Sequence, residues 1–137
     1  MALLNAREAV MGHFRPLLSR HDLTEQQWRV LRALGAEIEP VDAGTLADAT
    51  SLQAPSLSRI LANLADRRLI DRTSASDDQR RAVISLSTLG AELVSSVAPE
   101  SETIYAEIEA KFGEQQLRQL VAELHTLTTT LGAPGAS

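Results

Sequence analysis

The chain has 137 residues, with 18 acidic and 13 basic side chains and a formal net charge of −5. Hydrophobic residues make up 44% of it, which is enough to build the core of a single domain. No apolar run reaches the roughly 18 residues of a membrane-spanning helix, and the N-terminus lacks the pattern of a signal peptide, so we expect a cytoplasmic protein. The absence of cysteine excludes disulfides, thiol nucleophiles and cysteine-bound zinc. The acidic balance argues, at first, against nucleic acid as a partner.

The negative charge is concentrated in the last third of the chain. Residues 1–43 carry five Arg and six acids (−1), residues 44–90 carry six Arg and five acids (+1), and residues 91–137 carry two basic residues and seven Glu (−5). All but one of the basic residues are Arg, whose planar guanidinium suits forked contacts with phosphates and base edges. The middle of the chain can therefore bind nucleic acid although the whole chain is acidic. Its basic side chains between residues 51 and 72 are Arg59, Arg67, Arg68 and Arg72.

The first third of the chain predicts two helices. Apolar side chains recur at helical spacing over residues 2–20, which predicts an amphipathic helix. Thr24 and Gln27 have the spacing of a capping box, so a second helix is expected to begin there and to end at Gly35. Residues 40–44, which begin with proline and include a glycine, are expected to form a short loop.

The pattern of a helix-turn-helix follows. Residues 45–50 predict a helix of about two turns, residues 51–53 a turn, and residues 54–66 a second helix with Pro55 in its first turn, where proline is tolerated. The opposite face of this second helix is small, polar and basic, as the recognition helix of a DNA-binding motif requires. Its expected buried stripe consists of Leu57, Ile60, Leu61 and Leu64.

The spacing of apolar residues changes from a helical to a strand pattern after the second helix of this motif. Residues 69–73 and 82–86 have the pattern of two short strands, joined by a polar, turn-rich stretch. A β-hairpin that directly follows a helix-turn-helix predicts a winged helix-turn-helix with a two-stranded wing, here over residues 24–90.

The end of the chain predicts two further helices. Ser87 is a candidate cap for a long helix that keeps its apolar phase across Pro99, where it can be kinked. A last helix is expected over residues 114–131, and the tail at 132–137 is expected to be disordered. The predicted fold class is therefore mainly α, with one domain over residues 1–131.

The winged helix offers a set of side chains that can contact DNA. Short polar side chains at the start of the second helix can reach phosphates or base edges, and an arginine there can form a forked pair with guanine. Arginines at the base of the wing can reach a narrow minor groove. The alternative is that all of these are solvated surface residues around an ordinary helical hairpin. The candidate DNA-binding residues are Gln53, Ser56, Ser58, Arg59, Asn63, Arg80 and Arg81.

The hairpin also carries a family resemblance. LIDR at 69–72 and DQRRAVISLSTLG at 78–90 resemble the wing and the following helix start of MarR-type regulators. In that family the hairpin carries Asp-x-Arg and ends in Leu-Thr-x-x-Gly; Ser87 stands here in place of the Thr. The resemblance spans nearly the whole chain. A narrower branch, which contains repressors of homoprotocatechuate (aromatic-acid) degradation operons, is similar in AREA at 6–9, FRPL at 14–17 and LTEQQWRV at 23–30.

The resemblance implies a homodimer whose first and last helices intertwine. It also implies two winged helices on a pseudo-palindromic operator in double-stranded DNA, and a small phenolic effector that releases the DNA. The residues favour a dimer independently, because the helices at 2–20 and 114–131 are apolar along one stripe and exceed what a winged-helix core needs. We therefore expect residues 1–20 and 88–131 to form the dimerisation helices. The alternative is that they only cap their own domain.

The resemblance further implies an aromatic-acid site between the dimerisation helices and the winged helix. An arginine beside an aromatic wall suits this ligand, because it combines a forked charged pair with an apolar slot. Other interpretations stay open: Trp28 can belong to the core, Arg15 can pair with an acid such as Glu8, and His21 can simply end a helix. The candidate effector-binding residues are His13, Arg15, His21, Trp28 and Arg29.

We therefore expect a dimeric transcriptional repressor of an aromatic-acid catabolic operon, released by a small acid such as a hydroxyphenylacetate or hydroxycinnamate. An alternative is a winged-helix protein-interaction module without sequence-specific DNA binding, which the net negative charge would suit. An enzyme is not expected, because no nucleophile–base pair or Gly-rich phosphate loop is present. His13, His21 and His125 lack ligand spacing, so neither a metal site nor a cofactor is expected.

Overall fold

The computed structural model describes residues 1–74 and 82–132. This part of the chain contains six helices and three short strands, and none of its helices is long and apolar enough to cross a membrane. It has the mainly helical, winged helix-turn-helix fold that the sequence predicts. The helices are α1 (Ala2–Arg20), α2 (Glu25–Gly35), α3 (Ala43–Thr50), α4 (Ala54–Asp66), α5 (Thr88–Phe112) and α6 (Glu114–Leu131). The strands are β1 (Val41–Asp42), β2 (Ile70–Ser74) and β3 (Ala82–Leu86).

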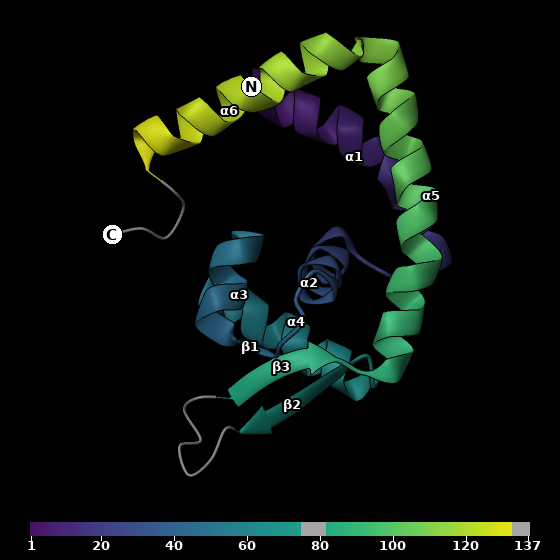
Figure 1. The fold of residues 1–137 in the computed structure, drawn as a ribbon, viewed down its shortest axis with the longest axis vertical. Coiled ribbons are helices and arrows are strands. Elements are labelled where there is room, and N and C mark those ends of the chain that lie inside the picture. Colours follow the sequence, from purple (N-terminus) through teal and green to yellow (C-terminus); the bar gives the residue numbers. More distant parts are fainter. Residues whose placement is uncertain (75–81, 133–137) are drawn as a thin grey trace.

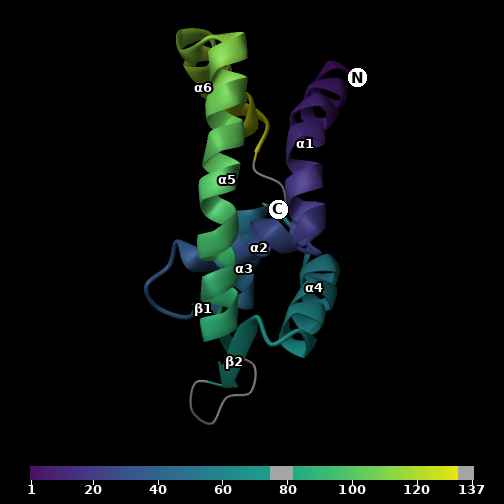
Figure 2. The ribbon, with the colours of Figure 1, turned by 90° about the vertical axis from the view of Figure 1, so that its right-hand side faces the viewer.

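The elements form two levels. In Figure 1 the lower level holds α2, α3, α4 and the strands, whereas α1 and α6 lie in the upper part of the view. The long helix α5 runs along one side and connects the two levels. Figure 2 shows α1 and α5 side by side, with α2 next to both of them.

A tight turn leads from α1 directly into α2. Asp22 adopts a left-handed conformation with φ 54°, and the N–H of Leu23 donates to the carbonyl oxygen of Leu18 at 2.9 Å. Thr24 then caps α2: its Oγ1 accepts from the backbone N–H of Gln27 at 3.1 Å, and its own N–H donates to Oε1 of Gln27 at 3.0 Å. The predicted capping box is confirmed, and it fixes the start of α2 beside the end of α1.

The helix-turn-helix forms as predicted, with one shift at its start. The Asp42 carboxylate accepts from the N–H of Thr45 at 2.7 Å, so α3 begins at Ala43, two residues before the predicted position. Ser51 turns the chain with φ 56°, and Pro55 lies in the first turn of α4. The predicted stripe of α4 is buried and consists of Leu57, Ile60, Leu61 and Leu64.

The sheet is antiparallel and has the strand order β1-β3-β2. β2 and β3 form the predicted wing hairpin, with β2 one residue later than expected; the connecting residues 75–81 lie outside the described residues. The expectation of a loop at residues 40–44 is wrong for Val41 and Asp42, which form β1 and pair with the middle of β3. Two residues are too few to show a strand pattern in sequence, and the pairing depends on the open edge that β3 offers.

α5 continues through Pro99 as one helix, as predicted. The Oγ of Ser87 accepts from the N–H of Gly90 at 3.0 Å and donates to the carbonyl oxygen of Arg68 at 2.6 Å. Ser87 therefore caps α5 and ties it to the end of α4. A Cβ on Gly90 would lie 2.0 Å from the carbonyl oxygen of Leu69, so glycine is needed for α5 to approach the wing this closely.

The core lies mainly in the lower level. Leu31, Leu64 and Ile84 come from α2, α4 and β3 and are at most 2% exposed. α1 adds buried side chains only in its second half, and Val97 adds one from α5. No residue of α6, all of which the structure describes, is buried. The predicted disordered tail falls almost wholly on residues 133–137, which lie outside the described residues.

Candidate DNA-binding and effector sites

The solvent-facing side of α4 carries most of the predicted DNA-binding residues. Gln53 stands directly before α4, and Ser58 and Arg59 are exposed on it, whereas Ser56 is half-buried. Arg59 makes no ion pair with another described residue, so its guanidinium is available to a phosphate or a base edge. This side of α4 has the small and basic character that a recognition helix needs.

Only some of the basic side chains of the wing belong to the described residues. Arg80 and Arg81 lie outside the described residues. Arg68, at the start of the hairpin, and Arg72, on β2, are exposed. With Arg59 they keep exposed positive charge on the winged helix, as the charge distribution in the sequence predicts.

Asn63 and Arg67, towards the other end of α4, are held by the corner between α1 and α2. The Nε2 of Gln27 donates to Oδ1 of Asn63 at 2.8 Å, and Nη1 of Arg67 donates to the carbonyl oxygen of Asp22 at 2.8 Å. Asn63, which the sequence predicts to contact DNA, therefore already accepts a hydrogen bond within its own chain. These two bonds fix the direction of α4 relative to α2.

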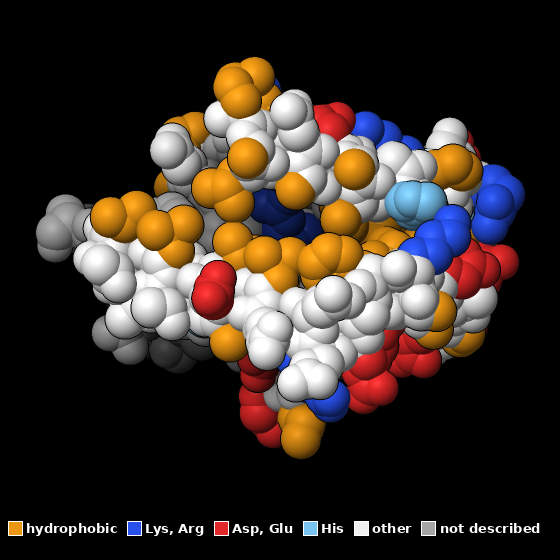
Figure 3. All heavy atoms as spheres, turned by 90° about the horizontal axis from the view of Figure 1, so that it is seen from above, with side chains coloured by type: hydrophobic (Ala, Val, Ile, Leu, Met, Phe, Trp, Pro, Cys, Tyr) orange, Lys and Arg blue, Asp and Glu red, His pale blue; other side chains and the backbone are white. Residues whose placement is uncertain are grey.

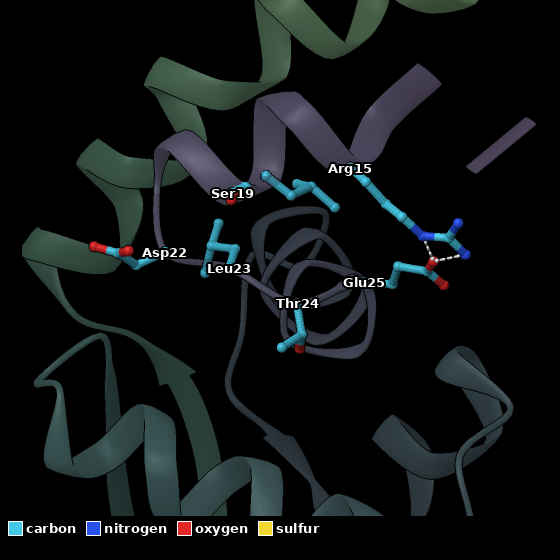
Figure 4. Close-up of a pocket in the computed structure, with 7 residues that line it drawn as sticks. Arg15, Ser19, Asp22, Leu23, Thr24 and Glu25 are labelled. Carbon is cyan, nitrogen blue, oxygen red and sulfur yellow. Dashed lines mark hydrogen bonds and ion pairs between the residues drawn. The ribbon is translucent and has the colours of Figure 1, made fainter. Parts of the chain in front are cut away.

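Arg15 belongs to a ring of four charged side chains between α1 and α2. Its Nη2 lies 2.8 Å from carboxylate oxygens of both Glu8 and Glu25, and Arg7 completes the ring at 2.6 Å from Glu25 and 3.3 Å from Glu8. The open alternative, in which Arg15 pairs with Glu8, is confirmed. Figure 4 shows Arg15 reaching from α1 to Glu25, at one side of an open hollow of about 500 Å³ in the α1–α2 corner.

The ring shifts the pKa of Arg15 and of Glu25. Hydrogen bonds to Glu8, and then to Glu25, raise the pKa of Arg15. Partial burial raises the pKa of the Glu25 carboxyl, but hydrogen bonds from Arg7 and Arg15 outweigh this and hold that pKa below its ordinary value of 4.5. Both groups are therefore charged at neutral pH, and the ring of two cations and two anions is electrically neutral.

The two predicted histidines lie in different places. His21 ends α1, and its Nε2 is 3.5 Å from a carboxylate oxygen of Glu100 on α5, so its interpretation as a helix-end residue is confirmed. His13 is exposed and lines an apolar groove of about 290 Å³ with Val10 of α1 and Ile108 of α5. Neither histidine lines the cavity beside Trp28.

Trp28 and Arg29 line one cavity of about 190 Å³, which we call the aromatic cavity. Trp28 is 7% exposed, so both of its interpretations hold: it belongs to the core and also forms a wall of the cavity. The rings of Phe14 and Tyr105 pack together with their centroids 4.7 Å apart. The complete lining comes from α1, α2 and α5 and consists of Met11, Phe14, Glu25, Trp28, Arg29, Arg32 and Tyr105.

Two guanidinium groups reach this cavity from α2. Nη1 of Arg32 donates to Oη of Tyr105 at 3.2 Å, and Cζ of Arg32 lies 5.5 Å from the centre of the Tyr105 ring. Nη1 of Arg29 donates to the carbonyl oxygen of Thr50 at 3.2 Å. Cationic groups beside aromatic walls provide a charged pair and an apolar slot for a small aromatic acid.

Sequence reasoning missed several members of this lining. Arg32 follows Trp28 by four residues, so helical spacing could have placed both on one face of α2. Tyr105 is 77 residues further along the chain than Trp28, and no local pattern predicts that they meet. Of the predicted effector residues the structure brings together Trp28 and Arg29, and it holds the other three in separate places: His13, Arg15 and His21.

Comparison with known proteins agrees with this geometry. Residues 21–81 match the sequence profile of the MarR family. The chain is 42% identical to the homoprotocatechuate degradative operon repressor of Escherichia coli over 120 residues, which cover 88% of this chain and 80% of the repressor. It is similar in structure to the transcriptional regulator PA4135, with a TM-score of 0.85, 38% identity and 93% of each chain covered. It is also similar to NadR in complex with 4-hydroxyphenylacetate, with a TM-score of 0.77, 36% identity, and 92% of this chain and 89% of NadR covered.

The Escherichia coli relative and PA4135 are transcriptional regulators and not enzymes. The identity to the former, over most of both chains, agrees with the resemblance of the wing motif and with the winged helix-turn-helix fold. This chain therefore belongs to the MarR family of transcriptional regulators.

Proposed function

We propose that the chain is a homodimeric repressor of an aromatic-acid catabolic operon, released from a pseudo-palindromic operator by a small aromatic carboxylate. The observation that carries the proposal is the aromatic cavity, where three aromatic rings and two guanidinium groups meet. The Escherichia coli relative is a repressor of a homoprotocatechuate degradative operon, and NadR forms a complex with 4-hydroxyphenylacetate. Both relatives support an aromatic acid as the class of effector.

The size and lining of the aromatic cavity suit one ring with short substituents. Its volume of about 190 Å³ is smaller than the roughly 300–1,000 Å³ of pockets for drug-sized ligands. Trp28 and Tyr105 offer apolar walls for the ring, and Arg29 or Arg32 can pair with the carboxylate. Glu25 can accept a hydrogen bond from a phenolic hydroxyl. A hydroxyphenylacetate- or hydroxycinnamate-like acid has this combination of groups. The assignment of His13, Arg15 and His21 to the effector stays a prediction.

On the DNA side, we propose that α4 enters the major groove and the wing follows the backbone towards the minor groove. Asn63 belongs to the predicted set; its Oδ1 accepts from Gln27, so its amide N–H groups are the part proposed to face DNA. Arg80 and Arg81 are proposed to approach the minor groove from the wing. The α4 side chains proposed to face the DNA are Gln53, Ser56, Ser58 and Arg59.

A second copy of the chain is the proposed partner of α1 and α6. Leu120, Val121 and Leu127 of α6 are each 42% exposed, and Leu3 of α1 is 61% exposed. Figure 3 shows hydrophobic side chains on both sides of a hollow at the end of the molecule where these helices lie. A pseudo-palindromic operator needs two reading heads, which explains why this surface would be covered by a second copy rather than by an unrelated protein.

The proposed mechanism is a shift between two arrangements of the reading heads. The aromatic cavity lies where α1 and α5 meet α2, which is between the helices proposed to hold the dimer and the winged helix. A ligand there can change the angle between the two parts. It releases the operator only if it binds more tightly to the arrangement that does not fit the DNA.

The effector proposal is tested by measuring operator affinity in the presence of defined acids. Fluorescence anisotropy with DNA from upstream of the protein's own gene would be recorded with 4-hydroxyphenylacetate, 4-hydroxycinnamate and benzoate. 2-(4-Hydroxyphenyl)ethanol, which lacks the carboxylate, is the control ligand. At least one acid should weaken operator binding by a factor within the roughly 5–150-fold typical of allosteric coupling, and the alcohol should not. An operator affinity that ignores all three acids would overturn the aromatic-acid assignment.

The DNA proposal is tested by the salt dependence of operator binding. Arg59→Ala should weaken binding and lower the slope of log affinity against log salt by about 1, because one contact that displaces counterions is lost. Arg118→Ala is the matched control, since Arg118 is an exposed arginine on α6 that pairs with Glu114. It should leave the slope unchanged. No DNA binding at low salt would instead favour a protein-interaction module.

A further inference from the structure

Arg29 lines the aromatic cavity and also contacts the helix-turn-helix. Its half-buried side chain starts on α2, next to Trp28, and donates to the carbonyl oxygen of Thr50 at 3.2 Å. Arg32, about one helical turn later, lines the same cavity but donates to Tyr105 of α5 at 3.2 Å. Two guanidinium groups of the same wall therefore have partners in different parts of the molecule.

Thr50 is the last residue of α3, directly before the turn that leads into α4. The last carbonyl groups of a helix have no N–H donor within that helix, and the helix dipole favours a cation there. Thr50 is 2% exposed, and its hydroxyl donates back to the carbonyl oxygen of Leu46 at 2.7 Å. Ser51 follows in a left-handed conformation with φ 56°. Arg29 thus holds the α3–α4 turn from the side of α2.

We propose that Arg29 is the positioning residue through which the effector acts on the recognition helix. Without effector, its guanidinium holds the Thr50 carbonyl and keeps the α3–α4 turn in the arrangement that fits the operator. An effector carboxylate in the aromatic cavity draws the guanidinium away from Thr50. The inference rests on the proposed function and assigns its transmission step to one hydrogen bond.

The bond to Thr50 is one that a carboxylate can displace. Its length of 3.2 Å is at the long end of the usual range of about 2.7–3.2 Å for N–H···O bonds. A carboxylate adds an opposite charge and can accept from two N–H groups of the guanidinium at once, which a single carbonyl oxygen does not, so it competes well with the carbonyl for the same guanidinium. A carbonyl that loses its partner in a partly buried place destabilises its surroundings, and here these surroundings are the turn before α4.

The test compares Arg29→Met with Arg32→Met, which remove the same group from the two sides of one cavity wall. Operator affinity would be measured with and without saturating 4-hydroxyphenylacetate. Without the acid, Arg29→Met should bind the operator about tenfold more weakly than the unchanged protein and clearly more weakly than Arg32→Met. At saturation, Arg32→Met should show the same loss of operator affinity as the unchanged protein, although it needs more acid. For Arg29→Met the affinities with and without acid should be nearly equal.

Two further measurements separate this role from direct DNA contact and from misfolding. The salt slope of Arg29→Met should equal that of the unchanged protein, because a half-buried arginine that contacts no phosphate releases no counterion. Thermal unfolding monitors the fold, and Arg29→Gln, which keeps a polar side chain, replaces the methionine variant if that variant does not fold. Hydrogen exchange of the unchanged protein should become faster in residues 51–53 when the acid is added.

The inference is overturned if Arg29→Met keeps the wild-type ratio of operator affinities, or if it binds the operator without acid as tightly as Arg32→Met does. A failure of the proposed function has a different signature, because the acid then leaves the operator affinity of the unchanged protein as it was. In that case the operator affinities measured without acid still test the contact between Arg29 and Thr50. Weaker operator binding in Arg29→Met alone supports a role of this contact in positioning the α3–α4 turn, and equal affinities of Arg29→Met and Arg32→Met refute it.

Discussion

α4 and α6 are both amphipathic helices, but only α4 is covered by its own chain. α4 has 13 residues and buries four leucine or isoleucine side chains, whereas α6 has 18 residues and buries none. The apolar stripe of α6 includes Leu120, Val121 and Leu127, each 42% exposed. An apolar stripe therefore predicts that a helix has a partner surface, but not which chain supplies that surface.

The largest difference is expected when one leucine is truncated in each helix. Leu64 on α4 is 0% exposed, so Leu64→Ala should lower the free energy of unfolding by about 2–5 kcal/mol through lost burial and a residual cavity. Leu127→Ala on α6 should change the free energy of unfolding of the subunit by no more than about 1 kcal/mol, and it should weaken the proposed dimer instead. Urea unfolding at two protein concentrations and sedimentation velocity distinguish the two effects. Equal, concentration-independent losses would mean that α6 is covered as well as α4 is.

A pair of glycines extends the comparison to α1 and α5, which lie side by side. Gly90→Ala should lower the free energy of unfolding by about 1–3 kcal/mol, because its Cβ would lie 2.0 Å from a backbone oxygen that cannot move freely. Gly12 lies on the exposed side of α1, where a Cβ meets nothing within 4 Å. Gly12→Ala should therefore raise stability by about 0.5–1 kcal/mol through higher helix propensity. Thermal unfolding should show shifts of opposite sign, and shifts of the same sign would contradict the close approach of α5 to the wing.

Structural features can be predicted from the sequence where the physical signal is local. The capping residues Thr24 and Ser87 stand next to the backbone groups that they satisfy, so helix starts can be predicted from spacing alone. The stripe of α4 repeats every turn and is equally local. The two-residue strand β1 and the meeting of Trp28 with Tyr105 depend on tertiary packing of distant segments. No spacing in the sequence carries that information.

For the same reason, the exposed face of α4 is easier to predict from the sequence than the lining of the aromatic cavity. Gln53, Ser58 and Arg59 lie on or next to one helix, so its periodicity separates them from the buried stripe. The aromatic cavity combines three helices, and the prediction from sequence included two of its residues, Trp28 and Arg29. Asn63 shows the limit of periodicity on α4 as well, because its partner Gln27 belongs to another helix.

A smaller effect is expected from the cap that joins the covered winged helix to α5. Ser87→Ala should lower the free energy of unfolding by about 1 kcal/mol, since the N–H of Gly90 and the carbonyl of Arg68 lose their partner. Ser96→Ala is the control, because the exposed Ser96 hydroxyl donates only to the carbonyl of Glu92 in the preceding turn. It should change stability by a few tenths of a kcal/mol at most. Equal effects in chemical unfolding would show that Ser87 acts as an ordinary surface serine.

The smallest expected effect concerns the charged ring that joins the start of α2, in the lower level, to α1, in the upper level. The pKa of Glu25 lies below its ordinary value of 4.5, so its charge stabilises the folded state above that pH and the contribution is lost as the pH falls through the folded-state pKa. Glu25→Gln should therefore lower the free energy of unfolding at neutral pH, and it should lower it progressively less in acid. The effect should be at most about 1 kcal/mol, because the arginine partners of Glu25 are partly exposed.

Glu114→Gln on the uncovered α6 is the matched control for this pH dependence. Glu114 forms an i,i+4 pair with Arg118 in which both side chains are more than half exposed, and such pairs contribute about 0.3–0.5 kcal/mol. Urea unfolding from neutral pH into acid should show the difference between the unchanged protein and Glu25→Gln shrinking, while Glu114→Gln stays close to the unchanged protein throughout. A Glu25→Gln difference that persists undiminished in acid would assign the effect to side-chain shape rather than to the charge, and the ring would then tie α1 to α2 through packing alone.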